Sequence, residues 1–325
     1  MKYISVHKLI LTILSVFILT GCQNSPQTRD DEKDTLRQLS IVTTTTHITD
    51  LVRQLTGEVC EILPMMGPGV DPHLYQPSAR DLQSLRTADL IVFHGLQLEG
   101  KLASAFESTG LNSEKIYSIS SQIDEALLLP AEEKKGKYFD PHLWFDPEIW
   151  TDCMNGLADK LVSIIPAKKG YIEQRAKELA DEYARIHEFG VRKIAQIPSK
   201  QRILVTSHDA FRYFGKSFEM EVVALQGIST AAEAGLADRS NLVDYLKVHK
   251  VPCIFIESSV NPKALREIAK EASVQLGEPL FSDALGPTDA FIQLPNGTNR
   301  SLATWSGMMT YNIHAICNGL AGKKK

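Results

Sequence analysis

The sequence predicts an α/β protein with two parallel-sheet α/β domains joined by one long backbone helix. Short runs rich in β-branched residues alternate with helical patterns, which is typical of α/β layers with parallel sheets. This alternation occurs twice, once on each side of an amphipathic stretch at 167–197. The chain has 325 residues and is 43% hydrophobic, which is enough for two cores of ordinary size.

Apolar runs predict four strands in each domain. In the first domain the strands are expected at 39–44, 59–63, 89–93 and 115–118, and helices at 48–55 and around 82–85. In the second domain the strands are expected at 202–206, 221–224, 253–257 and 279–281, and helices near 238–249, 262–275 and 302–319. The two halves therefore have the same kind of layered organisation.

The stretch between the domains has the pattern of one long helix. From Tyr171 to Ile194 apolar residues recur every three to five positions with charges between them, and Pro198 ends the pattern. At about 1.5 Å per residue this helix would be roughly 45 Å long, enough to run the length of both domains. We therefore expect an N-terminal domain at 39–165, a linking helix at 166–198 and a C-terminal domain at 199–325.

A leader precedes these domains. The apolar run 9–19 follows a basic start and is shorter than the roughly 20 residues that span a bilayer, so residues 1–21 predict a signal peptide. Leu19-Thr20-Gly21-Cys22 has the form of a bacterial lipoprotein cleavage box, in which Cys22 becomes the lipidated first residue. The alternative is a generic signal peptide with a chance cysteine. Residues 22–38 are polar, without an apolar period, and predict a disordered tether that lets the domains stand off the membrane.

The charge distribution argues against a nucleic-acid partner, and the cysteine spacing leaves disulfide formation open. Removing residues 1–21 takes away two lysines and no acids, which changes the formal net charge from −4 to −6. Because there is no basic stripe, we expect no nucleic-acid partner. The four remaining cysteines are widely spaced and include no Cys-x-x-Cys, so the sequence leaves open whether they form disulfides. They are Cys60, Cys153, Cys253 and Cys317.

Two copies of Asp-Pro-His indicate a metal site. They end at His73 and His142, about 70 residues apart, and proline after aspartate favours an extended loop that presents the histidine. His208 and Asp283 each follow an apolar run that predicts a strand. Three imidazoles and a carboxylate form a ligand set that a divalent transition metal accepts.

The predicted topology brings these four residues together. In open parallel sheets, ligands bind beyond the carboxyl ends of the strands. His73 follows a predicted strand of the first half, and His208 and Asp283 follow strands of the second half. His142 lies in the connection that leads to the long helix. We therefore expect a metal in the cleft between the two domains.

Other polar residues near the predicted strand ends are not expected to be ligands. His47 and His94 follow strands, and we expect them near the rim of the crevice in a structural role; the alternative is a second-layer or entry role. Glu257 ends a strand and could orient a ligand imidazole by accepting its second N–H. Asp71 and Asp140 are interpreted as loop-forming or second-layer residues, because each precedes a proline.

Several segments in the same order resemble the TroA-like metal-binding lipoproteins, a substrate-binding protein family of bacterial zinc and manganese ABC importers. The resemblance covers nearly all of the chain after the tether. The matching segments are 66–75, 139–146, 204–211, 225–230, 255–259 and 280–284. It implies two α/β domains joined by a long helix, with the metal ligands at His73, His142, His208 and Asp283.

The resemblance also bears on the choice of metal. Manganese-selective members of the family often carry Glu where His208 stands, and zinc-specific members usually carry a histidine-rich insertion before the second ligand. The stretch 131–139 contains no histidine. The resemblance therefore implies a protein that handles Mn²⁺ as well as Zn²⁺.

The function expected from the resemblance is that of a non-enzymatic, membrane-anchored extracytoplasmic receptor. It would capture Zn²⁺ or Mn²⁺ as a monomer and deliver the ion to an ABC permease in the membrane. One alternative is a surface adhesin with a structural metal. The other is a zinc hydrolase, which needs an open coordination position that four protein ligands leave little room for.

Overall fold

The N-terminal half contains a four-stranded parallel sheet. A computed structural model of the protein describes residues 38–131 and 138–321, so the leader, Cys22 and nearly all of the predicted tether lie outside it. Each of the four strands predicted for this half is present, in the order β2-β1-β3-β4. They are β1 (Leu39–Thr43), β2 (Cys60–Pro64), β3 (Leu90–Phe93) and β4 (Ile116–Ser118). The helices between them are α1 (Thr46–Thr56), α2 (Ala79–Thr87) and α3 (Gly100–Thr109).

Local sequence signals explain where these helices begin. The side chain of Thr45 accepts from the backbone N–H of Ile48 and caps α1. Ser78 and Asp81 form a reciprocal capping box at α2, which satisfies two backbone donors that the helix itself cannot. The α3 helix was not predicted.

The C-terminal half repeats the same strand order. The β5 strand (Ile203–His208) pairs in parallel with β6 (Glu221–Gln226), and β7 (Cys253–Ile254) pairs in parallel with β8 (Gln275–Leu276). The N–H of Phe255 donates to the carbonyl of Val205 at 2.9 Å, which places β7 beside β5. Its helices are α6 (Arg212–Phe218), α7 (Leu236–His249) and α8 (Lys263–Ala272).

Two strands predicted for this half are shorter than expected. Only Cys253 and Ile254 of the run 253–257 are in a regular strand, and the run 279–281 makes a single parallel bridge between Leu280 and Glu257. A small antiparallel hairpin, β9 (Phe291–Gln293) and β10 (Asn299–Ser301), was not predicted. The bridge still places the residues after Leu280 at the carboxyl end of β5 and β7, where the metal site was expected.

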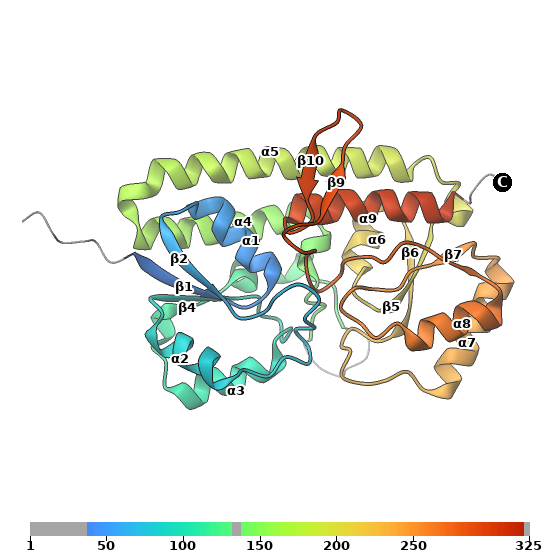
Figure 1. Cartoon of the computed structure of the whole chain (residues 1–325), viewed down its shortest axis with the longest axis horizontal. Coiled ribbons are helices and arrows are strands. Elements are labelled where there is room, and N and C mark those ends of the chain that lie inside the picture. The colour runs from blue at the N-terminus through green and yellow to red at the C-terminus, as the bar shows by residue number, and fades with distance from the viewer. Residues whose placement is uncertain (1–37, 132–137, 322–325) are drawn as a thin grey trace, which may run out of the picture. The chain divides into compact units, whose positions relative to one another are not determined.

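One long helix packs against both halves. The predicted long helix is α5 (Lys169–Ile194), whose 26 residues give a length of about 39 Å rather than 45 Å. It packs against α1 and α4 (Pro147–Ile164) from the N-terminal half and against α6 and α9 (Trp305–Leu320) from the C-terminal half. Figure 1 shows α5 alongside α4 and α9. The domain boundaries at 165 and 198 stay predictions.

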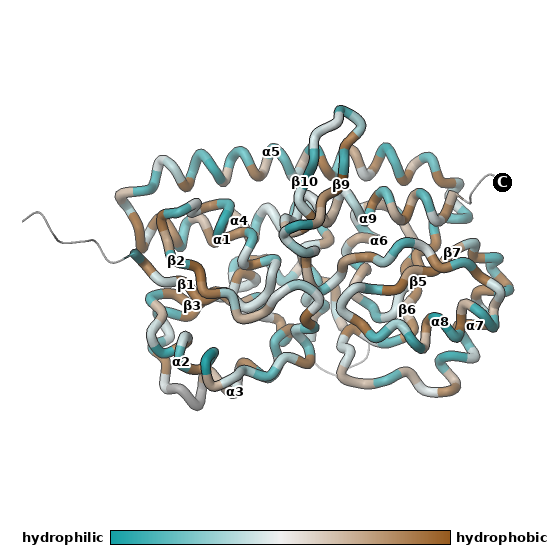
Figure 2. The backbone as a smooth tube through the Cα atoms, viewed as in Figure 1, coloured by the Kyte–Doolittle hydropathy of each residue, from teal (hydrophilic) through white to brown (hydrophobic). Residues whose placement is uncertain are grey.

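The halves are also joined by a continuous aromatic core. The ring of Phe145 stacks on that of Phe211 with centroids 4.3 Å apart. Trp305, the first residue of α9, donates from Nε1 to the carbonyl of Trp144 at 2.7 Å and from its backbone N–H to Asp50 Oδ2 at 2.8 Å. In Figure 2 the strands β1 and β5 are largely hydrophobic, whereas α5 alternates between hydrophilic and hydrophobic residues. The long helix is therefore not the sole connection.

The cysteines left open by the sequence are free thiols in the structure. Cys60, Cys153 and Cys253 are buried, and Cys317 is partly buried. Within residues 38–131 and 138–321, no helix combines the length and the apolar character needed to cross a membrane.

Candidate metal centre

Four side chains from distant parts of the chain meet in one buried cluster. His73, His142, His208 and Asp283 each place one potential ligand atom so that all four atoms lie within 4.8 Å of one another. His142 and His208 are fully buried, Asp283 is 1% exposed and His73 is 8% exposed. The structure thus brings together the four residues that the sequence singled out.

The elements around the cluster explain this convergence. His208 is the last residue of β5, and Asp283 comes three residues after the bridge at Leu280. His73 lies in the loop after β2, as predicted. His142 was expected in the connection to the long helix, and it stands before α4, the helix that precedes α5. Both halves therefore contribute two residues each.

The potential ligand atoms face one another but form no hydrogen bonds of good geometry with one another. The three imidazole rings have centroid separations of 5.3 to 5.8 Å. Asp283 places Oδ1 3.4 Å from His142 Nε2 and Oδ2 3.2 Å from His208 Nε2. Among the described residues, these oxygens and the Nε2 atoms of all three histidines have no hydrogen-bond partner of good geometry. Buried polar atoms are nearly always satisfied, so this group of lone pairs fits a cation.

Two of the histidines are held by a carboxylate on their other ring nitrogen. Asp140 Oδ1 accepts from the Nδ1 of His142 at 2.7 Å and from its backbone N–H at 3.0 Å. His208 Nδ1 lies 2.6 Å from Glu257 Oε2, and Glu257 Oε1 accepts from the N–H groups of Ser207 and His208. A carboxylate at Nδ1 fixes the proton there and leaves Nε2 free to bind a metal. The positions of Asp140 and Glu257 agree with their predicted roles.

His73 is held differently. Its backbone N–H donates to Asp71 Oδ1 at 2.8 Å, so Asp71 shapes the loop as predicted. The second carboxylate oxygen of Asp71 accepts from the hydroxyl of Thr230 at 2.6 Å. The first Asp-Pro-His loop is therefore fastened to the C-terminal half, whereas Asp140 fastens the ring of its own histidine.

The charges of the cluster shift its proton affinities in opposite directions. Burial alone lowers the pKa of His142, but the charge of Asp140, its hydrogen bond to the ring and the charge of Asp283 raise that pKa to about 9. Burial is likewise outweighed at His208, where Asp283 and Glu257 raise the pKa well above its ordinary value. At His73 burial prevails and lowers the pKa to about 3. Three carboxylates thus give the site an affinity for positive charge.

His47 and His94 are not at the rim of the crevice, so that prediction was wrong. Both are fully buried, His47 within α1 and stacked on Trp144 with centroids 4.5 Å apart. His94 donates from Nε2 to the carbonyl of Pro141 at 2.5 Å. Burial lowers the pKa of each to about 3, so both are neutral. Neither belongs to the ligand cluster, but His94 supports the loop that carries His142.

A cavity of about 260 Å³ opens beside His73. Its walls include Gln97 and Tyr138 from the N-terminal half and Ile228 and Ser229 from the C-terminal half. Because His73 lines this cavity and is the most exposed of the four residues, the cavity gives the cluster its access to solvent.

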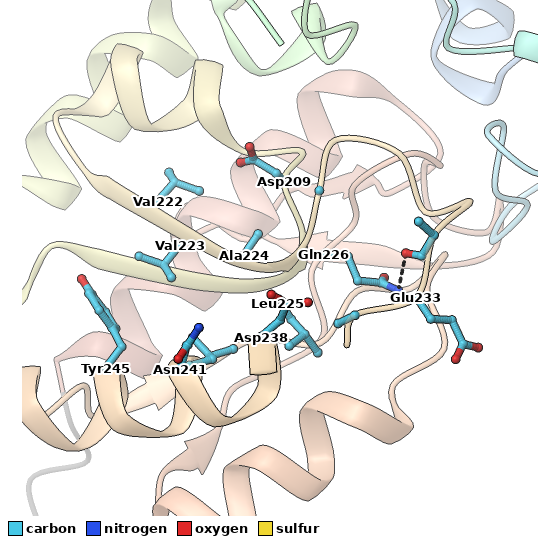
Figure 3. Close-up of a pocket in the computed structure, with 14 residues that line it drawn as sticks. Asp209, Val222, Val223, Ala224, Leu225, Gln226, Glu233, Asp238, Asn241 and Tyr245 are labelled. Atoms are coloured by element: carbon cyan, nitrogen blue, oxygen red, sulfur yellow. Dashed lines mark hydrogen bonds between the residues drawn. The ribbon is translucent and has the colours of Figure 1, made fainter. Parts of the chain in front are cut away.

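A separate groove of about 580 Å³ lies between β6 and α7 (Figure 3). Its lining includes Val222, Leu225, Glu233 and Tyr245, and none of the four cluster residues. The groove is therefore not the metal site.

Two side chains that support the cluster were not found from the sequence. They are Thr230, described above, and Tyr213, whose hydroxyl lies 3.3 Å from the carbonyl of Asp140. Thr230 falls within segment 225–230 of the family resemblance, which is the feature of the sequence that could have drawn attention to it. Tyr213 belongs to α6, which was not predicted.

Comparison with known proteins agrees with this fold. The family model described as "Zinc-uptake complex component A periplasmic" (ZnuA) matches residues 41–319. The chain is 36% identical over 320 residues to the zinc-binding protein TroA of Treponema pallidum, covering 97% of this chain and 99% of that protein. It is 34% identical over 313 residues to the manganese-binding lipoprotein MntA of Bacillus subtilis, covering 95% and 97% respectively.

A solved structure of the periplasmic zinc-binding protein TroA from Treponema pallidum has the same fold. It superposes with a TM-score of 0.80 and 35% identity, over 87% of this chain and 99% of that chain. The fold and site define an extracytoplasmic solute-binding component of an ABC importer, which is a transport component and not an enzyme. The chain belongs to the ZnuA family.

Proposed function

We propose that this protein captures one divalent transition metal ion, Zn²⁺ or Mn²⁺, through His73, His142, His208 and Asp283, and delivers it to an ABC permease. The observation that carries the proposal is the convergence of these four buried side chains, with their Nε2 and carboxylate atoms unsatisfied among the described residues. The names of relatives as zinc-binding TroA and manganese-binding MntA support the same cargo class.

The ligand set suits both metals. Three imidazole nitrogens and one carboxylate oxygen give the four ligands that Zn²⁺ favours. Both oxygens of Asp283 face the cluster, Oδ1 toward His142 and Oδ2 toward His208, so the carboxylate can bind in a bidentate way and raise the coordination number. A higher coordination number with two carboxylate oxygens makes Mn²⁺ acceptable, although Zn²⁺ should bind more tightly in vitro.

Delivery requires that the protein stay close to its permease. The cleavage box ending at Cys22 supports a lipid anchor at that residue. We expect a monomer, because one chain supplies all four ligands. A lipid anchor would keep the loaded protein at the membrane surface.

Metal uptake by cells tests this function directly. Cells that depend on this protein should accumulate labelled Zn²⁺ or Mn²⁺, and His142→Ala should abolish that uptake while surface levels of the protein stay normal. Uptake that continues at the wild-type rate in the variant would contradict the proposal. Adhesion lost together with uptake would favour the adhesin with a structural metal.

A further inference from the structure

The three histidines of the cluster are not supported equally. His142 and His208 each have a carboxylate at Nδ1, from Asp140 and Glu257, and both rings are fully buried. His73 is 8% exposed and lines the 260 Å³ cavity. The ligand nearest solvent is therefore the one whose position depends on its loop rather than on a carboxylate at its ring.

That loop is fastened by one chain of hydrogen bonds across the two halves. The hydroxyl of Thr230 donates to Asp71 Oδ2 at 2.6 Å, and Asp71 Oδ1 accepts from the N–H of His73 at 2.8 Å. Thr230 and Asp71 are 159 positions apart in the sequence. A hydroxyl donor to a carboxylate is among the stronger hydrogen bonds in proteins, so this contact favours one position of the His73 loop.

The segment that carries Thr230 also forms one wall of the access cavity. Ile228, Ser229 and Ala231 line the cavity beside His73. The carbonyl of Ala232 accepts from Gln226 Nε2 at 3.4 Å, which ties this segment back to β6, and Figure 3 shows the bond beside Glu233. A movement of the segment would therefore open the cavity and break the Thr230–Asp71 contact together.

We infer that Thr230 is a positioning residue which, through Asp71, holds His73 in the metal cluster and so sets how fast the ion leaves. The inference rests on the proposed function, because it needs a metal at His73. Thr230 does not touch the ion. It joins the cavity wall of one half to the ligand loop of the other, so displacement of this wall frees the outermost ligand first.

Release kinetics of Zn²⁺ test the inference. The purified protein is loaded with one equivalent of Zn²⁺, and release is followed in stopped flow with an excess of a chromogenic zinc chelator. Thr230→Val keeps the size of the side chain and removes the donor, so release should be roughly tenfold faster. Thr230→Ser keeps the hydroxyl and should release Zn²⁺ near the wild-type rate. The matched control is Thr87→Val on α2, where the exposed hydroxyl bonds only carbonyls of its own helix.

A double-mutant cycle separates positioning from a general structural effect. Asp71→Ala should speed release as well, and adding Thr230→Val to it should change the rate less than twofold further. Thr230→Ala repeats the test if the valine variant folds poorly, and the melting temperature of each metal-free variant is measured beside the rate.

The outcomes distinguish failure of the inference about Thr230 from failure of the proposed function. Wild-type release by Thr230→Val and Thr230→Ala, with the ion still bound stoichiometrically, would overturn the inference and leave the proposed function intact. Faster release that serine does not rescue, or that is fully additive with Asp71→Ala, would also overturn it. If the wild-type protein retains neither Zn²⁺ nor Mn²⁺, the proposed function itself fails and the inference with it.

Discussion

Replacing Glu257 by glutamine should weaken metal binding without removing any ligand. Glu257 Oε2 lies 2.6 Å from His208 Nδ1, and Oε1 accepts from the N–H groups of Ser207 and His208 at 2.8 and 2.9 Å. An amide keeps one acceptor, which the two backbone donors occupy. Its NH₂ group then faces Nδ1 and favours a proton on Nε2, the nitrogen that must be free to bind the ion.

The expected loss follows from the role of such partners in metal sites. Removal of a carboxylate that orients a ligand imidazole typically costs 10- to 100-fold in metal affinity, or about 1.4 to 2.7 kcal/mol. Both side chains are fully buried, so solvent does not screen the contact. We expect Glu257→Gln to fall in this range.

Competition titration against a chelator of known affinity measures the effect for Zn²⁺. The control is Glu188→Gln on α5, an exposed glutamate whose contact is with Arg192 on the same helix. The control should bind as the wild type does. An affinity of Glu257→Gln within twofold of the wild type would refute the role of Glu257, provided that circular dichroism shows a folded variant.

Two further predictions concern buried side chains behind the site. His94→Phe should weaken Zn²⁺ binding about tenfold in the same titration, because the carbonyl of Pro141 loses its donor. His94→Gln can still donate, so its Zn²⁺ affinity should stay within threefold of the wild type. Equal Zn²⁺ affinities of the two variants would contradict this prediction. Burial raises the pKa of Asp50 from 3.8 to about 6 in the metal-free fold. Protonated Asp50 therefore stabilises this fold at low pH, and that stability is lost as the pH rises from about 4 through 6. Relative to the wild type, Asp50→Asn should therefore gain up to about 3 kcal/mol in free energy of unfolding between pH 4 and pH 7.5, measured by urea titration; a constant difference would contradict the pKa.

The sheets could be predicted because their strands are short apolar runs with clear boundaries. β1 to β4 fall within two residues of the predicted runs, and β1 and β3 are largely buried parallel strands rich in Ile, Val and Leu. The run 253–257 satisfies the same pattern but forms only a two-residue strand. Beyond Ile254 the backbone bonds to single residues, as at the bridge between Glu257 and Leu280, and propensity does not distinguish such a bridge from a strand.

The helix α4 begins with a recognisable signature in the sequence. Asp146 accepts from the N–H groups of Glu148 and Ile149, and Pro147 occupies the first turn, which is a strong start signal. Buried residues at helical spacing then follow, from Trp150 to Leu161. The interpretation of this segment as a simple connection therefore overlooked local information, whereas β9 and β10 have only three residues each, which is too short for a clear strand pattern.

The cluster could be predicted because each member carries a local signal at a strand end or before a proline. Distances between segments are a tertiary property, so the sequence could not show that Thr230 reaches Asp71 or that His94 reaches Pro141. For the same reason His47 and His94 were expected near the rim. Both follow strands, yet the aromatic rings of Trp144 and Trp150 enclose them.

Metal stoichiometry of the intact protein tests the central claim most directly. Non-denaturing mass spectrometry would follow Zn²⁺ and Mn²⁺ on the wild type and on His208→Ala, which removes the ligand from the end of β5. We predict one tightly held ion per chain in the wild type, and loss or strong weakening in the variant. An absence of stoichiometric binding of either ion to the wild type would contradict the metal-receptor account.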